Sequence, residues 1–128
     1  MTKKNYNIEF LFKALADRTR LRLISLIGDS EVCVCFFVVI LKISQPKISR
    51  HLAYMRRAGI VTSRREGKWM HYRLAEPPDQ HAARIFREVR ASLAEHPEFQ
   101  LDRKKLAAVC CAPNLPVQLR RAPRPLAA

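Results

Sequence analysis

Apolar residues recur at helical spacing near the start of the chain. In residues 8–16, Leu11 and Leu15 lie four positions apart, which predicts a first helix. Residues 18–27 carry a second apolar stripe, and Asp17 immediately before them is a suitable N-cap. We therefore expect two consecutive helices that meet at Asp17.

The clearest helical pattern lies in residues 44–59. Ser44 is a suitable N-cap, and Pro46 fits a first turn, where a backbone N–H has no intrahelical partner. One apolar stripe at helical spacing is formed by Ile48, Leu52 and Met55. Residues 79–94 predict a further amphipathic helix whose apolar positions are Ala82, Ile85, Phe86, Val89 and Leu93.

Residues 32–41 form an unbroken apolar run, so they show no clear period. Their valines, isoleucine and phenylalanines would suit a buried strand as well as a helix. Because the neighbouring segments are helical, we predict a helix over residues 30–41, with Ser30 as its N-cap.

Two short alternating segments, residues 60–65 and 68–74, predict a β-hairpin with its turn at Glu66–Gly67. A helix, a short turn, a basic helix and a basic hairpin thus follow one another. This order is typical of a winged helix-turn-helix, in which the second helix enters the major groove of DNA. The predicted fold class is mainly α with a two-stranded β-hairpin wing.

We expect two regions in the chain. Residues 1–96 would form the winged helix-turn-helix domain for DNA binding and dimerisation. Residues 97–128 would be a basic, proline-rich C-terminal tail that carries a Cys-Cys pair. Within this tail we expect at most a short helix over residues 106–111 and a disordered end from about Pro113.

The charge of the chain is strongly positive. Its 128 residues hold 24 Lys and Arg against 11 Asp and Glu, for a net charge of +13. Residues 42–73 alone contain nine basic residues and one acidic residue. Because this segment covers the predicted basic helix and hairpin, we expect double-stranded DNA as its partner.

The predicted DNA contacts follow from the polar side of the basic helix and from the hairpin. Gln45 and Arg50 are the expected base readers, because amide and guanidinium groups make bidentate contacts to bases. The full predicted set is Ser44, Gln45, Lys47, Ser49, Arg50 and His51 in the helix, and Arg65 and Lys68 in the wing.

Other functional classes find little support. The three glycines, Gly28, Gly59 and Gly67, cannot build a glycine-rich phosphate loop. The ten-residue apolar run is about half of what a bilayer requires, and the first ten residues do not resemble a secretory signal. Without a secretory signal, we expect a cytoplasmic protein. Without a CxxC motif or a nucleophile beside a base, we expect that it is not an enzyme.

Four cysteines form two close pairs, Cys33 with Cys35 and Cys110 with Cys111. In a reducing cytosol, close cysteine pairs bind metals or undergo redox chemistry more often than they form structural disulfides. Both pairs are therefore candidate ligands, although free cysteine is also common as a buried apolar residue.

The sequence resembles the ArsR/SmtB family of metalloregulatory repressors, and its arsenic-responsive members in particular. The similarity spans residues 10–94 and includes the stretches LADRTRL at 15–21, EVCVC at 31–35, SQPKISRHL at 44–52 and GKWMHYRL at 67–74. The resemblance implies a homodimeric repressor, joined through the first helix and the helix of residues 79–94. No cofactor would be required, and trivalent arsenic or antimony would be the inducer that releases the operator DNA.

The chain departs from the family pattern in two ways. Family members usually continue from the Cys-Val-Cys into Asp-Leu, often with a third cysteine, whereas Phe36, Phe37 and Val38 follow here. In addition, some arsenical sensors of the family bind through vicinal cysteines beyond the last helix, so Cys110 and Cys111 compete for this role. Trivalent arsenic prefers three thiolates, and an organic arsenical with one carbon substituent needs two.

The predicted helix suggests a mechanism for release. Residues i and i+2 of a helix point about 200° apart, so one ion could bind both Cys33 and Cys35 only if the first turn of the helix were distorted. That turn leads to the basic helix, so its distortion would weaken operator binding.

Two alternatives remain, namely a regulator switched by thiol oxidation or one switched by zinc. Asp79 and His81 match half of a zinc site of the family, but Ser92 stands where a histidine is needed and His96 is out of register.

Overall fold

The computed structural model describes residues 5–111, 119 and 121–127, with the side chains of residues 111, 126 and 127 left out of the description. The chain begins with two helices, α1 (Ile8–Leu15) and α2 (Arg18–Ile27). The Asp17 carboxylate accepts a hydrogen bond of 2.9 Å from the backbone N–H of Arg20, which confirms it as the N-cap of α2.

The segment after α2 is not the single helix that we predicted. Residues Ser30–Cys33 form strand β1, and helix α3 (Val34–Leu41) starts only afterwards. In β1, Val32 and Cys33 are fully buried and pair antiparallel with Tyr72 and His71. The strand prevails because a partner strand, distant in sequence, satisfies its backbone groups, while the hydrophobic core buries its apolar side chains.

The basic helix and the hairpin form as predicted, with one shift. Helix α4 (Gln45–Arg57) buries Ile48, Leu52 and Met55 completely. Strands β2 (Val61–Glu66) and β3 (Trp69–Leu74) pair antiparallel, and Glu66 lies opposite Trp69. The turn therefore consists of residues 67 and 68, one position later than expected, because Gly67 takes the positive φ of 60° that the turn requires.

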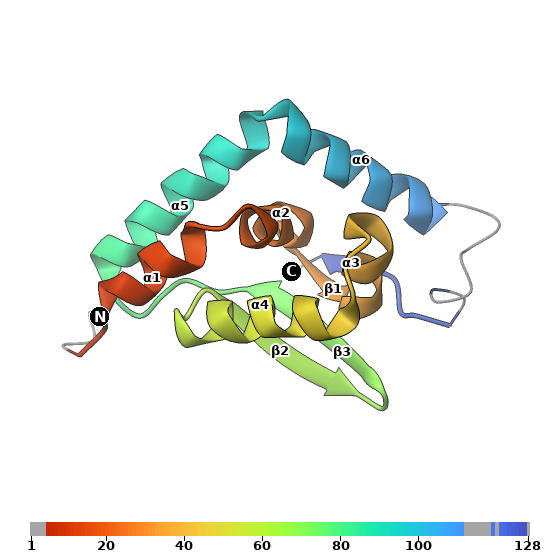
Figure 1. The fold of residues 1–128 in the computed structure, drawn as a ribbon, viewed down its shortest axis with the longest axis horizontal. Helices are drawn as coiled ribbons and strands as arrows, with labels where there is room; N and C mark the ends of the chain where they lie inside the picture. Colours follow the sequence, from red (N-terminus) through yellow and green to blue (C-terminus); the bar gives the residue numbers. More distant parts are fainter. Residues whose placement is uncertain (1–4, 112–118, 120, 128) are drawn as a thin grey trace.

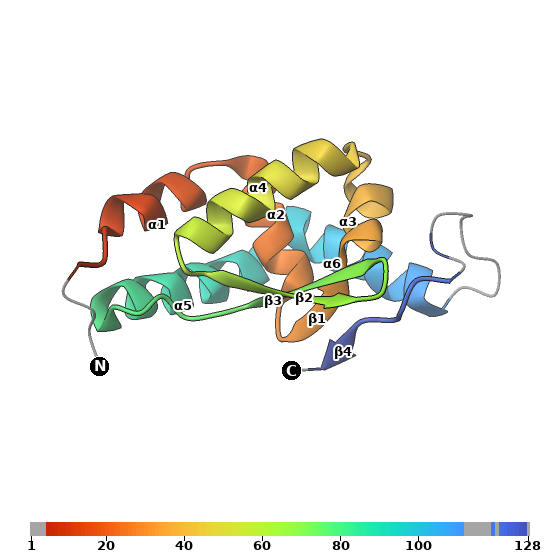
Figure 2. The same cartoon turned by 90° about the horizontal axis from the view of Figure 1, so that it is seen from below.

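Two long helices complete the helical part. The predicted helix of residues 79–94 is α5 (Gln80–Glu95), and α6 (Pro97–Cys111) follows it. Figures 1 and 2 show that α5 and α6 extend along one side of the molecule, away from α4 and the hairpin. The expectation of at most a short helix in this part is wrong, because α6 is fifteen residues long and buries Phe99 and Asp102.

The described C-terminal residues return to the sheet. Strand β4 (Leu126–Ala127) pairs with β1, which gives the strand order β2-β3-β1-β4 (Figure 2). Leu119 is fully buried, so part of the segment expected to be disordered contacts the core. The rest of that expectation concerns residues 113–118, 120 and 128, which lie outside the described residues. Within the described part of the chain, no helix is long and apolar enough to cross a membrane.

Candidate DNA interface and thiol site

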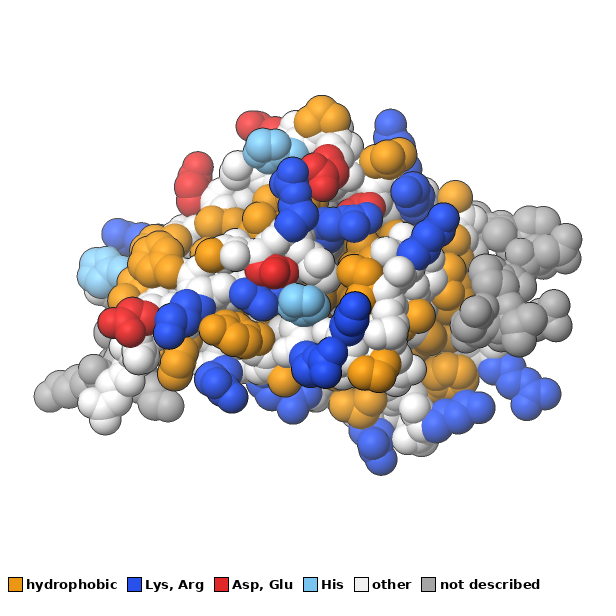
Figure 3. Space-filling model, in the orientation of Figure 1, with side chains coloured by type: hydrophobic (Ala, Val, Ile, Leu, Met, Phe, Trp, Pro, Cys, Tyr) orange, Lys and Arg blue, Asp and Glu red, His pale blue; other side chains and the backbone are white. Residues whose placement is uncertain are grey.

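Helix α4 presents polar side chains on the side opposite its buried stripe. Ser44, Gln45, Lys47 and Arg50 are exposed, and Ser49 is half-buried. Figure 3 shows the molecule in the orientation of Figure 1, and Lys and Arg side chains are spread over its lower half, where α4 and the hairpin lie. The exposed residues of α4 therefore form a positively charged surface that is accessible to a polyanion.

His51 has a different environment from the other predicted contacts. It is half-buried, and its Nδ1 lies 3.2 Å from Arg20 Nη1 and 3.7 Å from Asp17 Oδ2. Burial is the main cause that lowers the pKa of His51, and the positive charge of Arg20 lowers it further. His51 therefore contacts the start of α2 as well as belonging to α4.

Sequence reasoning missed the role of Arg20, which connects three helices. Its guanidinium donates hydrogen bonds to the carbonyl oxygens of Ala14 (2.9 Å) and Lys13 (2.7 Å) at the end of α1. The same group stacks on the Tyr54 ring of α4, 4.4 Å from its centroid. Arg20 thus fixes the position of α4 relative to α1 and α2. No sequence pattern reveals this, because the partners lie on separate elements.

The hairpin adds two exposed cations beside this surface. Arg65 and Lys68 are exposed near the tip, and Lys68 Nζ lies 4.9 Å from the centroid of the Trp69 ring. Arg64, by contrast, forms an ion pair of 2.6 Å with Glu31 on β1. Arg65 and Lys68 are thus exposed positive charges at the tip of the hairpin.

Cys33 and Cys35 are adjacent in space, with their Sγ atoms 2.9 Å apart. Cys33 is fully buried and Cys35 is half-buried. The expected distortion of a helical turn is wrong for this pair. Cys33 is the extended N-cap residue of α3 (φ −70°, ψ 141°), so its side chain does not follow the helical spacing. Because β1 ends at Cys33, the two thiols already converge.

The two thiols differ in acidity. A hydrogen bond from the Cys35 thiol is the main cause that lowers the pKa of Cys33 to about 6, and the nearby His71 ring contributes in the same direction. The pKa of Cys35 is raised, because its hydrogen bond to the Cys33 thiolate and its burial both oppose a second negative charge. At neutral pH the pair therefore consists of one thiolate and one thiol.

The second cysteine pair lies at the end of α6. Cys110 is half-buried and packs against the core, and its carbonyl oxygen accepts a hydrogen bond of 2.6 Å from Arg124. The side chain of Cys111 lies outside the described residues.

The two residues that match half of the family's zinc site, Asp79 and His81, have other environments in the described structure. The Asp79 carboxylate caps α5 by accepting a hydrogen bond of 2.9 Å from the Ala82 N–H, and the His81 side chain is exposed. The His96 ring packs edge-on against Phe99. Among the residues that the structure describes, no three His, Cys, Asp or Glu side chains gather as a metal site.

Known proteins resemble this chain in sequence. The profile described as "Bacterial regulatory protein, arsR family" matches residues 17–63. The chain is 44% identical to the arsenical resistance operon repressor of Escherichia coli (strain K12) over 103 residues, which cover 80% of this chain and 86% of that protein. It is 55% identical over 65 residues to the arsenic resistance transcriptional regulator ArsR1 of Pseudomonas putida (strain KT2440), covering 50% of this chain and 51% of that protein.

Solved structures resemble it in fold. HlyU from Vibrio cholerae N16961 superposes with a TM-score of 0.55 at 29% identity, covering 70% of this chain and 97% of that chain. The transcriptional repressor BigR from Xylella fastidiosa superposes with a TM-score of 0.53 at 33% identity, covering 66% of this chain and 80% of that chain. These similarities confirm the predicted fold class. The chain belongs to the ArsR family of bacterial regulatory proteins and is a DNA-binding winged helix-turn-helix repressor.

Proposed function

We propose that this repressor releases its operator when trivalent arsenic or antimony binds to Cys33 and Cys35. The observation that carries the proposal is the separation of 2.9 Å between the two Sγ atoms. Soft thiolates are the ligands that such ions prefer, and a pair that already converges loses little conformational freedom when it binds. The names of the two arsenic-resistance relatives support the same inducer.

The acidity of the pair suits the chemistry of arsenite. At neutral pH, As(OH)3 is uncharged and carries three hydroxyl groups. The Cys33 thiolate attacks arsenic and a hydroxide leaves. The Cys35 proton then neutralises a second leaving hydroxide as water. Two As–S bonds form, two As–O bonds break, and one hydroxyl stays on arsenic. That hydroxyl is the position for a third thiolate, for which Cys110 and Cys111 are the candidates.

The position of the pair provides a route to the DNA surface. Cys33 ends β1, which pairs with β3 of the wing, and Cys35 lies in the first turn of α3. Helix α3 ends at Leu41, and its C-cap residue Lys42 takes a left-handed conformation (φ 56°) shortly before α4 begins at Gln45. An ion bound to both cysteines would therefore shift the positions of the wing and of α4 together. A coupling of about 1–3 kcal/mol would weaken operator binding about 5–150-fold.

We also propose that the repressor binds DNA as a homodimer joined through α1 and α5. Helix α1 exposes two large apolar side chains, Ile8 and Phe12, with Phe12 51% exposed. A partner subunit would cover these side chains and place two copies of α4 in successive major grooves. Ser44, Gln45, Lys47, Ser49, Arg50 and His51 would contact the groove, and Arg65 and Lys68 the flanking phosphates.

Operator release tests this function. Fluorescence anisotropy follows a labelled copy of the promoter DNA at fixed salt concentration, because phosphate contacts make the affinity salt-dependent. Arsenite, phenylarsine oxide and antimonite should each release the DNA, whereas zinc should not. Tight binding that none of the three disturbs would contradict the arsenic inducer and leave the DNA-binding function standing.

One observation favours a second candidate, a thiol-oxidation switch. The same separation of 2.9 Å would allow hydrogen peroxide to take two electrons from the thiolate and the thiol, so that an S–S bond forms, the peroxide O–O bond breaks, and water and hydroxide leave. The DNA assay separates the candidates. Release by hydrogen peroxide that dithiothreitol reverses, without any response to arsenite, would establish oxidation as the signal.

A further inference from the structure

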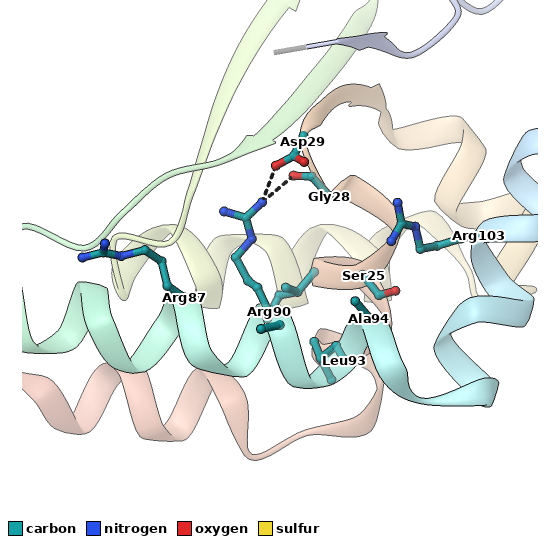
Figure 4. A pocket seen from close by; sticks show the side chains of 10 residues that line it. Ser25, Gly28, Asp29, Arg87, Arg90, Leu93, Ala94 and Arg103 are labelled. Carbon is teal, nitrogen blue, oxygen red and sulfur yellow. Dashed lines mark hydrogen bonds and ion pairs between the residues drawn. The ribbon is translucent and has the colours of Figure 1, made fainter.

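A cavity of about 350 Å³ lies between α2, α5 and α6 (Figure 4). Three arginines line it, namely Arg87 and Arg90 on α5 and Arg103 on α6. The acidic residue in its lining is Asp29, in the turn that leads from α2 into β1. Three arginines and one carboxylate thus line a cavity that is large enough for a small molecule.

Two of the three arginines in the lining form ion pairs, and the third, Arg103, is the available positive charge. Arg90 Nη2 donates hydrogen bonds to Asp29 Oδ1 (2.7 Å) and to the Gly28 carbonyl oxygen (3.3 Å), as Figure 4 shows. Arg87 Nε lies 3.4 Å from Glu76 Oε1, and both of these side chains are more than half exposed. Among the described residues, no carboxylate lies within ion-pair distance of Arg103.

The lining also contains a buried hydroxyl that lacks a partner. Ser25 is 7% exposed, and its Oγ is the buried side-chain polar atom in the described structure that makes no hydrogen bond. Burying a hydroxyl without a hydrogen bond is unfavourable, so such an atom in a native protein calls for an explanation. Ile24 and Leu93 add an apolar surface beside it.

We propose that this cavity binds a small organic anion, with its phosphate or carboxylate group held by Arg103 and by the Arg90 N–H groups other than Nη2, which bonds Asp29 and Gly28. The Ser25 hydroxyl would donate a hydrogen bond to the same group, and the organic part would pack against Ile24 and Leu93. Guanidinium groups suit this ligand because they bind phosphate and carboxylate oxygens in a bidentate manner. The site is separate from Cys33 and Cys35, and it does not depend on the proposed arsenic response.

Isothermal titration calorimetry on the full, reduced chain tests the proposal at constant ionic strength. Four probes separate the contributions, namely phenyl phosphate, benzoate, inorganic phosphate and the neutral benzyl alcohol. We expect phenyl phosphate or benzoate to bind with one site per chain, inorganic phosphate to bind more weakly, and benzyl alcohol not to bind. The stronger of the first two identifies the anionic group. Failure of every anion to saturate a site by about 10 mM would overturn the proposal.

Matched variants distinguish this site from general attraction to a basic protein. Arg103→Ala should weaken binding of the stronger aromatic probe about tenfold, because a hydrogen bond to a charged group is lost. Arg84→Ala removes the same charge from an exposed position of α5 outside the cavity, so it should change the affinity less than about twofold. Equal weakening by the two variants would contradict a specific site.

Ser25→Ala provides a further check that is independent of charge. Because the hydroxyl has no partner in the described structure, its removal should leave the melting temperature unchanged or raise it. The same variant should weaken binding of the aromatic probe several-fold. Unchanged affinity in both Ser25→Ala and Arg103→Ala would overturn the assignment.

Discussion

Cys33 and His71 lie opposite each other in the antiparallel pairing of β1 with β3. The His71 ring is 1% exposed, and its Nε2 lies 3.1 Å from Glu66 Oε1 near the hairpin turn. The strand that carries the acidic thiol is therefore joined to the wing by backbone pairing, and the buried His71 side chain in turn links β3 to Glu66 on β2 within the wing. This arrangement places the candidate inducer site directly beside one of the two elements that would contact DNA.

The acidity of Cys33 can be measured by thiolate absorbance near 240 nm. In a background with Cys110→Ser and Cys111→Ser, we expect one thiolate to appear with a midpoint at a pH of about 6, and the other only in strong alkali. Cys35→Ala removes the stabilising hydrogen bond and should move the midpoint towards the ordinary value of 9.0. An unchanged midpoint in Cys35→Ala would show that Cys35 does not activate Cys33.

The same acidity makes folding stability depend on pH. The pKa of Cys33 is lower in the folded state than its ordinary value, so the unfolded chain binds more protons between pH 6 and 9. The contribution of Cys33 to the free energy of unfolding should therefore rise as the pH increases from about 6 to about 9, and be lost as the pH falls through about 6. Urea unfolding at both ends of this window should show the rise in the parent chain and not in Cys33→Ser.

The connection between α2 and α6 depends on a bidentate ion pair. Arg22 donates hydrogen bonds of 2.8 and 2.9 Å to the two carboxylate oxygens of Asp102, which is 2% exposed. Asp102→Ala should lower the free energy of unfolding by about 3 kcal/mol, because Arg22 then loses its partner in a largely buried site. Urea denaturation with a fixed m-value measures the effect.

A second ion pair between the same helices serves as the control. Arg18 and Glu98 lie 2.9 Å apart, but both side chains are about half exposed or more. Exposed pairs contribute little, so Glu98→Ala should change the stability by less than about 0.5 kcal/mol. Similar losses in Glu98→Ala and Asp102→Ala would show that burial of the Arg22 pair does not set its strength.

The predicted DNA contacts separate into readers of sequence and holders of phosphate. Gln45→Ala and Arg50→Ala should each weaken operator binding about tenfold, with little effect on unrelated DNA, because bidentate base contacts discriminate by about 1–3 kcal/mol. Lys68→Ala should weaken binding to both DNAs and reduce the salt slope by about one. Anisotropy titrations at several salt concentrations measure both effects. Equal losses on both DNAs for Gln45→Ala and Arg50→Ala would contradict their role as readers.

Local sequence signals predicted the parts of the fold that local chemistry determines. Asp17 caps α2 as expected, and Ile48, Leu52 and Met55 form the buried face of α4. The extent of α6 was not predictable in the same way, because its buried Asp102 pairs with a residue 80 positions earlier in the chain.

The candidate thiol site was predicted by residue type but not by geometry. The two cysteines are visible in the sequence, yet a helical reading of residues 30–41 places their side chains far apart. The pairing of Cys33 with His71 holds this residue in a strand, and only the tertiary structure reveals that pairing. The exposed cations of α4 and the hairpin could be predicted from the distribution of charge in the sequence. The contact of His51 with Arg20 could not, because the two residues lie on separate helices.

The most direct test of the central claim is the arsenite concentration that releases half of the bound promoter DNA, compared between two double variants. Cys33→Ser with Cys35→Ser should bind DNA like the parent chain and resist release at every arsenite concentration that releases the parent. Cys110→Ser with Cys111→Ser should still release the DNA, with at most a higher half-point if one of these thiols is the third ligand. The opposite pattern, with normal release from Cys33→Ser/Cys35→Ser and none from Cys110→Ser/Cys111→Ser, would contradict the account.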